Sequence, residues 1–156
     1  KEVRVGLMKS LIPSYVMRDT HEVNSVVRNL ARNIVSGDME GALKLLQTFL
    51  ATVPYCDNTD YEGHYQQMLY VIFSLLGIYT DVEVHTHKGR VDMVLRTRTT
   101  LYLVELKLNQ SAEAAMKQID LQQYSDRFAL CGLPVVKVAI NFSAETRTIA
   151  DWEIVL

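Results

Sequence analysis

The fold of this chain is decided by two apolar stretches, GRVDMVL at residues 89–95 and LYLVELK at residues 101–107. Valine, leucine, tyrosine and methionine fill most positions of both, a composition typical of β-strands. The segment RTRTT at residues 96–100 separates them and is polar throughout. The sequence therefore predicts two antiparallel strands joined by a short turn.

Besides Arg90 near the start of the first stretch, charged residues interrupt these apolar strands at Asp92 in the first, and at Glu105 and Lys107 in the second. Side chains alternate between the two faces of a strand, so Glu105 and Lys107 share a face, and the hairpin can bring Asp92 beside them. Two carboxylates can hold a hard cation such as Mg²⁺, while the lysine orients a water or stabilises a developing anion. The competing interpretation is a cross-strand ion pair on a half-exposed sheet, worth little to stability. The apolar neighbours favour a buried strand and therefore the first interpretation.

The order of three short motifs resembles the PD-(D/E)XK nuclease superfamily. The motifs are GRVD at 89–92, VELK at 104–107 and AAMKQI at 114–119. The likeness is closer to the nuclease-like domain at the C-terminus of bacterial proteins that begin with an AAA-type ATPase-like domain, and it covers about residues 60–156. One departure is that Val91, not proline, precedes Asp92.

This resemblance implies Mg²⁺- or Mn²⁺-dependent hydrolysis of nucleic-acid phosphodiesters, with DNA the expected substrate. The metal ligands it implies are Asp92, Glu105, the Leu106 carbonyl and Glu62. Lys107 would position the attacking water or stabilise charge in the transition state. From the residues alone, Thr59-x-x-Glu62 also fits a capping box, in which Glu62 bonds only to backbone N–H groups.

The helix expected at residues 112–130 adds further candidates. Gln118 falls on a stripe with Leu121, Ser125 and Phe128, so a polar amide interrupts a surface expected to face the core. In the resembled nucleases a glutamine at this place reaches the active site, and Tyr124 follows at the family's spacing; a satisfied packing amide is the alternative. Candidates for contacts to substrate are Lys88, Arg90, Lys117 and Tyr124. The three cations among them would contact phosphates.

The remaining pattern predicts an α/β fold: a restriction-endonuclease-like α-β-β-β-α-β core with a mixed sheet of about five strands, decorated by N-terminal helices. Helices are expected at about 19–36, 38–54 and 61–76, and further strands at 81–88, 135–142 and 148–155. The strand–helix–strand order from residue 101 to 142 predicts a parallel pair. The strand at 81–88 has mixed polarity, which indicates a sheet edge.

The chain begins with Lys1 and already has helical spacing there, which predicts a piece of a longer protein. We expect residues 1–55 to form a helical connector that follows an upstream ATPase-like domain, and residues 56–156 to form the nuclease-like domain. The sequence does not decide the oligomeric state. A homodimer stays an alternative, because members of the resembled superfamily often pair to cut both strands.

Composition limits the classes of function. The 156 residues are 49% hydrophobic and 22% charged, as in an ordinary globular chain, and the formal net charge is -2. This charge counts against a tight, non-specific DNA binder. With no run of about 18 apolar residues and no signal peptide, a cytoplasmic protein without membrane contact is expected. The alternative function is a catalytically weak or inactive module that binds nucleic acid or docks the ATPase-like part.

Overall fold

A five-stranded mixed sheet forms the centre of the chain in the computed structural model, which describes residues 20–52, 61–87, 90–121, 132–143 and 145–156. The strands lie in sequence order across the sheet. Neighbours are antiparallel except β3 and β4, which are parallel. The bounds are β1 Asp81–His87, β2 Arg90–Arg96, β3 Leu101–Leu108, β4 Val135–Ser143 and β5 Thr148–Val155. This confirms the predicted α/β core, including the hairpin, the parallel pair and the edge position of β1.

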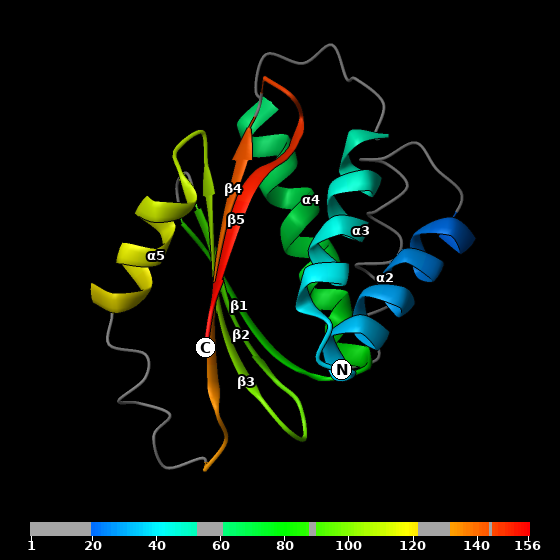
Figure 1. Cartoon of the computed structure of the whole chain (residues 1–156). Helices are drawn as coiled ribbons and strands as arrows, with labels where there is room; N and C mark the ends of the chain where they lie inside the picture. Colours follow the sequence, from blue (N-terminus) through cyan, green and yellow to red (C-terminus); the bar gives the residue numbers. More distant parts are fainter. Residues whose placement is uncertain (1–19, 53–60, 88–89, 122–131, 144) are drawn as a thin grey trace.

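Helices cover both faces of this sheet (Figure 1). The helices α2 Thr20–Val35, α3 Met39–Ala51 and α4 Tyr61–Leu75 lie on one side, and α5 Ala112–Leu121 lies on the other. The α5 helix packs on β3 and β4, because it is the crossover that makes these two strands parallel. The predicted N-terminal helices are therefore confirmed.

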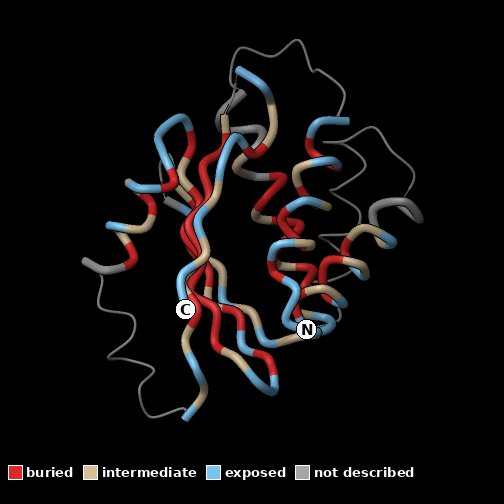
Figure 2. Tube along the Cα trace, viewed as in Figure 1, coloured by how far each residue is buried: buried red, intermediate tan, exposed pale blue. Residues whose placement is uncertain are grey.

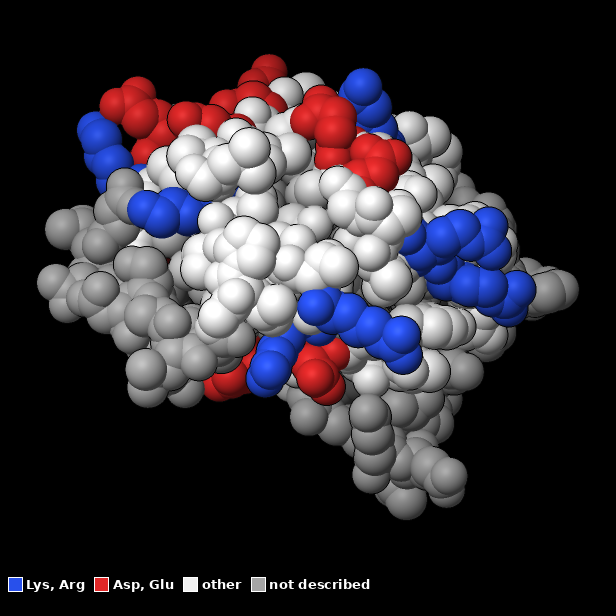
Figure 3. Space-filling view, turned by 60° about the horizontal axis from the view of Figure 1, so that its bottom comes forward, with Lys and Arg blue, Asp and Glu red and all other residues white. Residues whose placement is uncertain are grey.

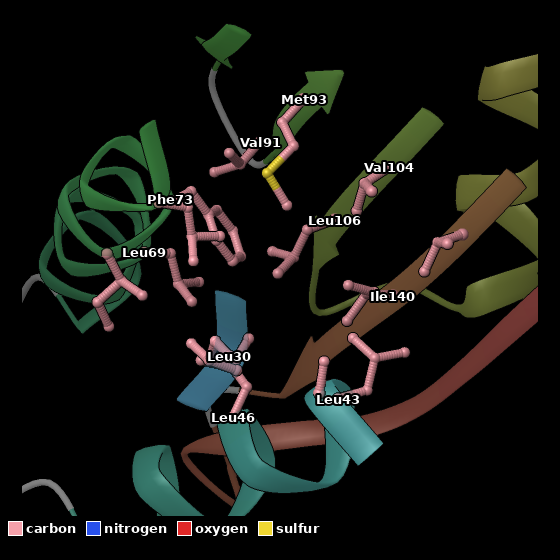
Figure 4. Close-up of a cluster of buried hydrophobic side chains, with 14 of the residues drawn as sticks. Leu30, Leu43, Leu46, Leu69, Phe73, Val91, Met93, Val104, Leu106 and Ile140 are labelled. Atoms are coloured by element: carbon pink, nitrogen blue, oxygen red, sulfur yellow. The ribbon is translucent and has the colours of Figure 1, made fainter. Parts of the chain in front are cut away.

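The main core lies between the sheet and the three helices α2, α3 and α4. Val91 and Met93 of β2 and Val104 and Leu106 of β3 are buried there. Figure 4 shows these side chains converging with residues of the helices, and Figure 2 shows buried positions along the strands and the inner sides of the helices. Because alternate residues face the core, the intervening residues of β2 and β3 must point to the α5 side.

Local signals set the connection between α2 and α3. Gly37 has a positive φ of 87°, a conformation that glycine adopts without steric cost, and it follows the end of α2. Asp38 then caps α3, since its Oδ1 accepts a hydrogen bond of 2.9 Å from the Gly41 amide. Both features agree with the predicted helix boundary.

The buried positions of α5 are Ala112, Ala115 and Ile119, at 5%, 0% and 1% exposed, and Gln118 is half-buried beside them. Gln118 therefore borders the face that α5 turns toward the sheet. The side chains of Leu121, Ser125 and Phe128, the other members of the predicted stripe, lie outside the described residues. The two alanines let the helix lie close to the sheet. Residues 122–130 of the predicted helix lie outside the described part.

No helix among the described residues is long and apolar enough to cross a membrane.

Candidate active site

Four charged side chains meet on the α5 side of the β2–β3 hairpin. The register places Asp92 directly opposite Glu105, and Arg90 directly opposite Lys107. Directly opposed residues of an antiparallel pair point to the same face. The sequence prediction that Asp92, Glu105 and Lys107 share one face is therefore confirmed, and Arg90 joins them.

The two carboxylates are buried although they are charged groups. Glu105 is 0% exposed and Asp92 is 4% exposed. Among the described residues, the buried polar or charged side chains are these two, Thr97 and Asn141. A buried carboxylate is costly unless it is paired or bound to a cation, so this hairpin is not a solvated surface ion pair. The interpretation as a half-exposed ion pair is thereby excluded.

The cations around Glu105 lie at the limit of ion-pair distance. Arg90 Nε lies 3.8 Å from Glu105 Oε1, and Lys107 Nζ lies 4.0 Å from the same atom. Both separations are longer than a hydrogen bond. None of the described residues donates a hydrogen bond to either carboxylate oxygen of Glu105. Glu105 thus has cations nearby but no direct donor.

Burial raises the pKa of Glu105 from 4.5 to about 7, with a further contribution from the negative charge of Asp92. Arg90 and Lys107 act in the opposite direction but do not cancel the effect. Two adjacent buried carboxylates disfavour each other's ionisation, and a divalent cation between them relieves that repulsion.

The site's composition therefore fits a hard divalent cation. Two carboxylates on adjacent strands offer oxygen ligands, and both oxygens of Glu105 are buried without a hydrogen-bond donor among the described residues. Within the described ranges, no group of three or more His, Cys, Asp or Glu residues is placed to hold a metal. Further ligands would have to come from backbone oxygens such as that of Leu106, from water or from side chains outside the described set.

Glu62 lies in the first turn of α4, but its side chain is outside the described residues. One turn later, Gln66 Nε2 donates a hydrogen bond of 3.1 Å to the Arg90 carbonyl. The start of α4 is therefore tied to the start of β2. The α4 helix packs on the face of the sheet opposite Asp92 and Glu105.

The other predicted site residues are less closely gathered. Gln118 is half-buried on α5, the helix that lies over this face of the sheet. Lys117 is 71% exposed and pairs with Glu113 of the same helix, with 2.9 Å between Nζ and Oε1. Such an exposed pair is a common surface feature of helices. Lys88 and Tyr124 lie outside the described residues.

A polar network next to Lys107 was not predicted. Asn141 of β4 lies opposite Lys107 in the register and is 8% exposed. Its Nδ2 donates to Asp151 Oδ1 at 3.0 Å, and its Oδ1 accepts from the Gln110 amide at 3.0 Å. Asp151 Oδ2 also accepts from the Ala112 amide at 3.3 Å. This network ties the turn after β3, and with it the start of α5, to β4 and β5.

In the sequence, the Asn141 network is indicated by a lone asparagine in the apolar strand VAINF at residues 138–142. The bond from Gln66 to the Arg90 carbonyl is indicated by an amide four residues after Glu62. Both are polar interruptions of apolar patterns, which must find partners when buried. Neither signal names the partner.

We expect Asn141→Ala to lower the free energy of unfolding by about 1–2 kcal/mol, because it removes two hydrogen bonds at a buried position. Urea denaturation followed by circular dichroism measures this. Ser143→Ala is a matched control at the end of the same strand, since the Ser143 hydroxyl receives only a long contact of 3.4 Å. Equal stabilities of the two variants would show that the network contributes nothing.

Comparisons with known proteins agree with this geometry. Residues 60–152 match the family described as the PD-(D/E)XK nuclease superfamily. The chain is also 27% identical, over 164 aligned residues, to "Uncharacterized protein in vnfD 5'region" of Azotobacter chroococcum mcd 1. That alignment covers 97% of this chain but 30% of the relative, so the chain spans less than a third of its length. No solved structure matches the chain.

Proposed function

This chain belongs to the PD-(D/E)XK nuclease superfamily, and we propose that it is a divalent-metal-dependent nuclease that hydrolyses phosphodiester bonds of DNA. Nucleases of this superfamily generally use divalent metals. One observation carries the proposal: Asp92 and Glu105 are buried directly opposite each other, with Lys107 Nζ 4.0 Å from Glu105. A carboxylate pair beside an ammonium is suited to phosphodiester hydrolysis.

Mg²⁺ or Mn²⁺ would be held by Asp92, Glu105, the Leu106 carbonyl and Glu62, the last directly or through water. When bound, the ion supplies charge stabilisation to the phosphate and lowers the pKa of water. The raised pKa of Glu105 supports this assignment, because a bound cation would offset the burial and the negative charge of Asp92 that raise it.

The remaining residues act on the water and the phosphate. Lys107 would orient the attacking water or stabilise the charge that develops on the phosphate oxygens. Its side chain is 11% exposed, so its ammonium acts where water is scarce and electrostatic effects are large. Gln118, half-buried on α5, would orient Lys107 or the phosphate.

Arg90 is the best supported of the predicted phosphate contacts. It lies opposite Lys107 at the start of β2, its Nε is 3.8 Å from Glu105 Oε1, and 22% of its side chain is exposed. We propose that Lys88, Lys117 and Tyr124 make further contacts to the DNA backbone or bases. Lys117 would have to exchange its Glu113 partner for a phosphate.

The length of the relative supports a role within a larger protein. The aligned part is 30% of that chain, which leaves room for other domains. We propose that residues 1–55 connect an upstream ATPase-like domain to a nuclease unit at residues 56–156, and that the protein acts in the cytoplasm. A homodimer would let two such units cut both strands of a duplex.

A second candidate is a catalytically weak module that binds nucleic acid or docks the ATPase-like part. It is favoured by the net charge of -2 and by the finding that no third His, Cys, Asp or Glu joins the carboxylate pair within the described residues. Metal binding separates the candidates, because a functional carboxylate pair should bind Mn²⁺ at millimolar concentrations or below.

The testing experiment is a cleavage assay on linear duplex DNA, single-stranded DNA and RNA of the same sequence. Each substrate is incubated with Mg²⁺, Mn²⁺ or EDTA, and Mn²⁺ binding is followed in parallel by electron paramagnetic resonance. We expect DNA cleavage with either metal and none with EDTA. If Mn²⁺ does not bind and no substrate is cut, the nuclease proposal is wrong.

A further inference from the structure

A cavity lies at the other end of the β2–β3 hairpin from Arg90 and Lys107. It has a volume of about 670 Å³ and is formed where α2 ends, where β1 begins and where β2 turns into β3. We call it the turn cavity, lined among others by Val35, Ile78, Tyr79, Asp81, Arg96 and Arg98. Figure 1 shows the β2–β3 turn at the bottom of the molecule, and Figure 3 brings this end toward the viewer.

Apolar side chains are exposed in this cavity. Val35, Ile78 and Tyr79 are 49%, 40% and 44% exposed. The other large exposed hydrophobic residues of the described part are Val155 and Leu156, the last two of the chain. Three of these five residues therefore line one hollow, where they are available to an apolar or aromatic group of a ligand.

The charge of the cavity is positive. The charged residues among those that line it are Arg96, Arg98 and Asp81. The whole chain is negative, with a formal charge of -2, so this local excess runs against the overall balance. On the face seen in Figure 3, Lys and Arg side chains stand in separate groups around a broad uncharged surface. An anionic ligand with an apolar or aromatic part would be complementary to such a cavity.

The backbone that presents the two arginines is fixed by hydrogen bonds. Thr97 is buried, its Oγ1 donates to the Thr100 carbonyl at 3.1 Å, and it accepts from the Thr100 amide at 3.0 Å. Thr80 Oγ1 donates to the Arg96 carbonyl at 2.7 Å. Little backbone entropy would be lost on binding, because the turn is already ordered by its own threonines.

Arg96 also lies in line with the candidate active site. It is four residues after Asp92 on β2, and an even spacing along a strand places both on the same face. At about 3.3 Å per residue, the two positions are about 13 Å apart along the strand. Arg96 is therefore the lining residue that shares a face with the carboxylate pair, whereas Val35 of α2 and residues 77–80 line the cavity from the helix side of the sheet.

We propose that the turn cavity binds a single-stranded segment of the nucleic-acid substrate, with its phosphates on Arg96 and Arg98 and a base stacked on Tyr79. The proposal rests on the proposed nuclease function. Stacking on an exposed aromatic ring together with cationic contacts to the backbone is how proteins hold single strands without sequence preference. The excess of cations over carboxylates favours a polynucleotide over an acidic peptide, because a nucleic-acid strand supplies negative charge and ring faces at every residue.

The experiment measures binding of a fluorescein-labelled mixed-sequence single-stranded DNA oligonucleotide by anisotropy in EDTA, where no metal-dependent cleavage occurs. Tyr79→Ala and Arg98→Ala are compared with the wild type and with Lys44→Ala, an exposed cation on α3 that does not line the cavity. We expect each cavity variant to weaken binding about tenfold, and Arg98→Ala also to reduce the salt dependence of binding by about 0.7 in the logarithmic slope. Lys44→Ala should bind like the wild type.

Controls separate this inference from the nuclease proposal. Tyr79 and Arg98 are exposed, so their variants should fold, and circular dichroism checks this. Arg98→Lys keeps the positive charge and should therefore retain most of the salt dependence. If the wild type cuts DNA but the cavity variants bind the oligonucleotide as it does, the turn cavity is not a strand site and the nuclease proposal stands. If cavity variants lose binding while no metal supports cleavage, the strand site stands and the nuclease proposal fails. The strand site would be overturned if the wild type did not bind the oligonucleotide detectably. It would also be overturned if Tyr79→Ala bound DNA like the wild type but no longer self-associated, since the cavity would then be a contact between copies of the chain.

Discussion

Asp92→Ala and Lys107→Ala are each expected to lower the rate of metal-dependent DNA cleavage by about a thousandfold. Asp92 is one of the two buried carboxylates that we propose hold the metal, and Lys107 Nζ lies 4.0 Å from the other, Glu105. Removal of a single group that stabilises transition-state charge typically costs a hundredfold to a thousandfold. Loss of a metal ligand also weakens the binding of the ion itself. Single-turnover cleavage of linear duplex DNA at saturating Mg²⁺ measures both losses.

The two variants should differ in metal binding, which separates their roles. Asp92→Ala removes a proposed ligand, so Mn²⁺ affinity should fall with activity. Lys107→Ala removes a positive charge near the ion, so Mn²⁺ affinity should be retained or rise while cleavage is lost. Glu153→Gln, an exposed carboxylate of β5, is the matched control and should cut like the wild type. Full cleavage by Asp92→Ala would remove the carboxylate pair from the mechanism.

Misfolding is not expected to explain the loss in Asp92→Ala. The charge of Asp92 raises the pKa of Glu105, which means that the two carboxylates repel each other in the folded protein without metal. Removing Asp92 relieves that repulsion, although it leaves a small space in a packed face. A folded but inactive variant is therefore the expected result, and thermal unfolding in EDTA checks it.

The central hairpin could be predicted from the sequence because strand alternation is a local rule. Once 89–95 and 101–107 were assigned as strands, the period of two placed Glu105 and Lys107 on one face. The antiparallel register then brought Asp92 opposite Glu105. The polar turn between them is short, so it left little freedom in that register. Arg90, predicted only as a phosphate contact, proved to lie opposite Lys107.

Contacts between distant segments could not be predicted in the same way. The network of Asn141, Asp151 and the Gln110 amide depends on how β4 and β5 pair, and that register shifts between Asn141 and Phe142. No local pattern encodes such a shift, because a bulge moves one strand against its neighbour. Likewise, the bond from Gln66 to the Arg90 carbonyl depends on how far α4 extends along β2.

The inner face of α5 was only partly predictable. The predicted stripe ran through Gln118 and Leu121, and Ala112, Ala115 and Ile119, the buried positions, were not named in it. Close packing of a helix on a sheet favours small side chains, which a search for strong hydrophobicity undervalues. Gln118 therefore borders the buried stripe, and the assignment of its role to the site remains a proposal.

The second large effect is expected in the stability of the metal-free protein. The pKa of Glu105 is raised from 4.5 to about 7 in the folded state, chiefly by burial. Below pH 4.5 the carboxyl is protonated in both folded and unfolded chains and does not oppose folding. As the pH rises toward 7, the unfolded chain releases this proton first, so folding becomes less favourable.

The wild type should therefore lose stability relative to Glu105→Gln between pH 4.5 and pH 8, by about 3 kcal/mol in free energy of unfolding. Glutamine has the same shape but no charge, so the difference between the two pH profiles isolates Glu105 from all other titrating groups. Urea denaturation in EDTA at intervals across this range measures it. Parallel profiles for wild type and variant would show that Glu105 titrates normally and is not buried as described.

Addition of Mg²⁺ or Mn²⁺ connects this stability to the proposed activity. A cation that binds the ionised pair in the folded state stabilises the wild type by mass action, and most strongly at pH 8, where no proton competes for Glu105. Glu105→Gln lacks one carboxylate and should gain little from the metal at any pH. We therefore expect the metal to restore the stability that the wild type loses in EDTA as the pH rises, and to have no such effect on Glu105→Gln. A gain of equal size in both proteins would place the bound ion away from Glu105, and the carboxylate pair would then need another explanation.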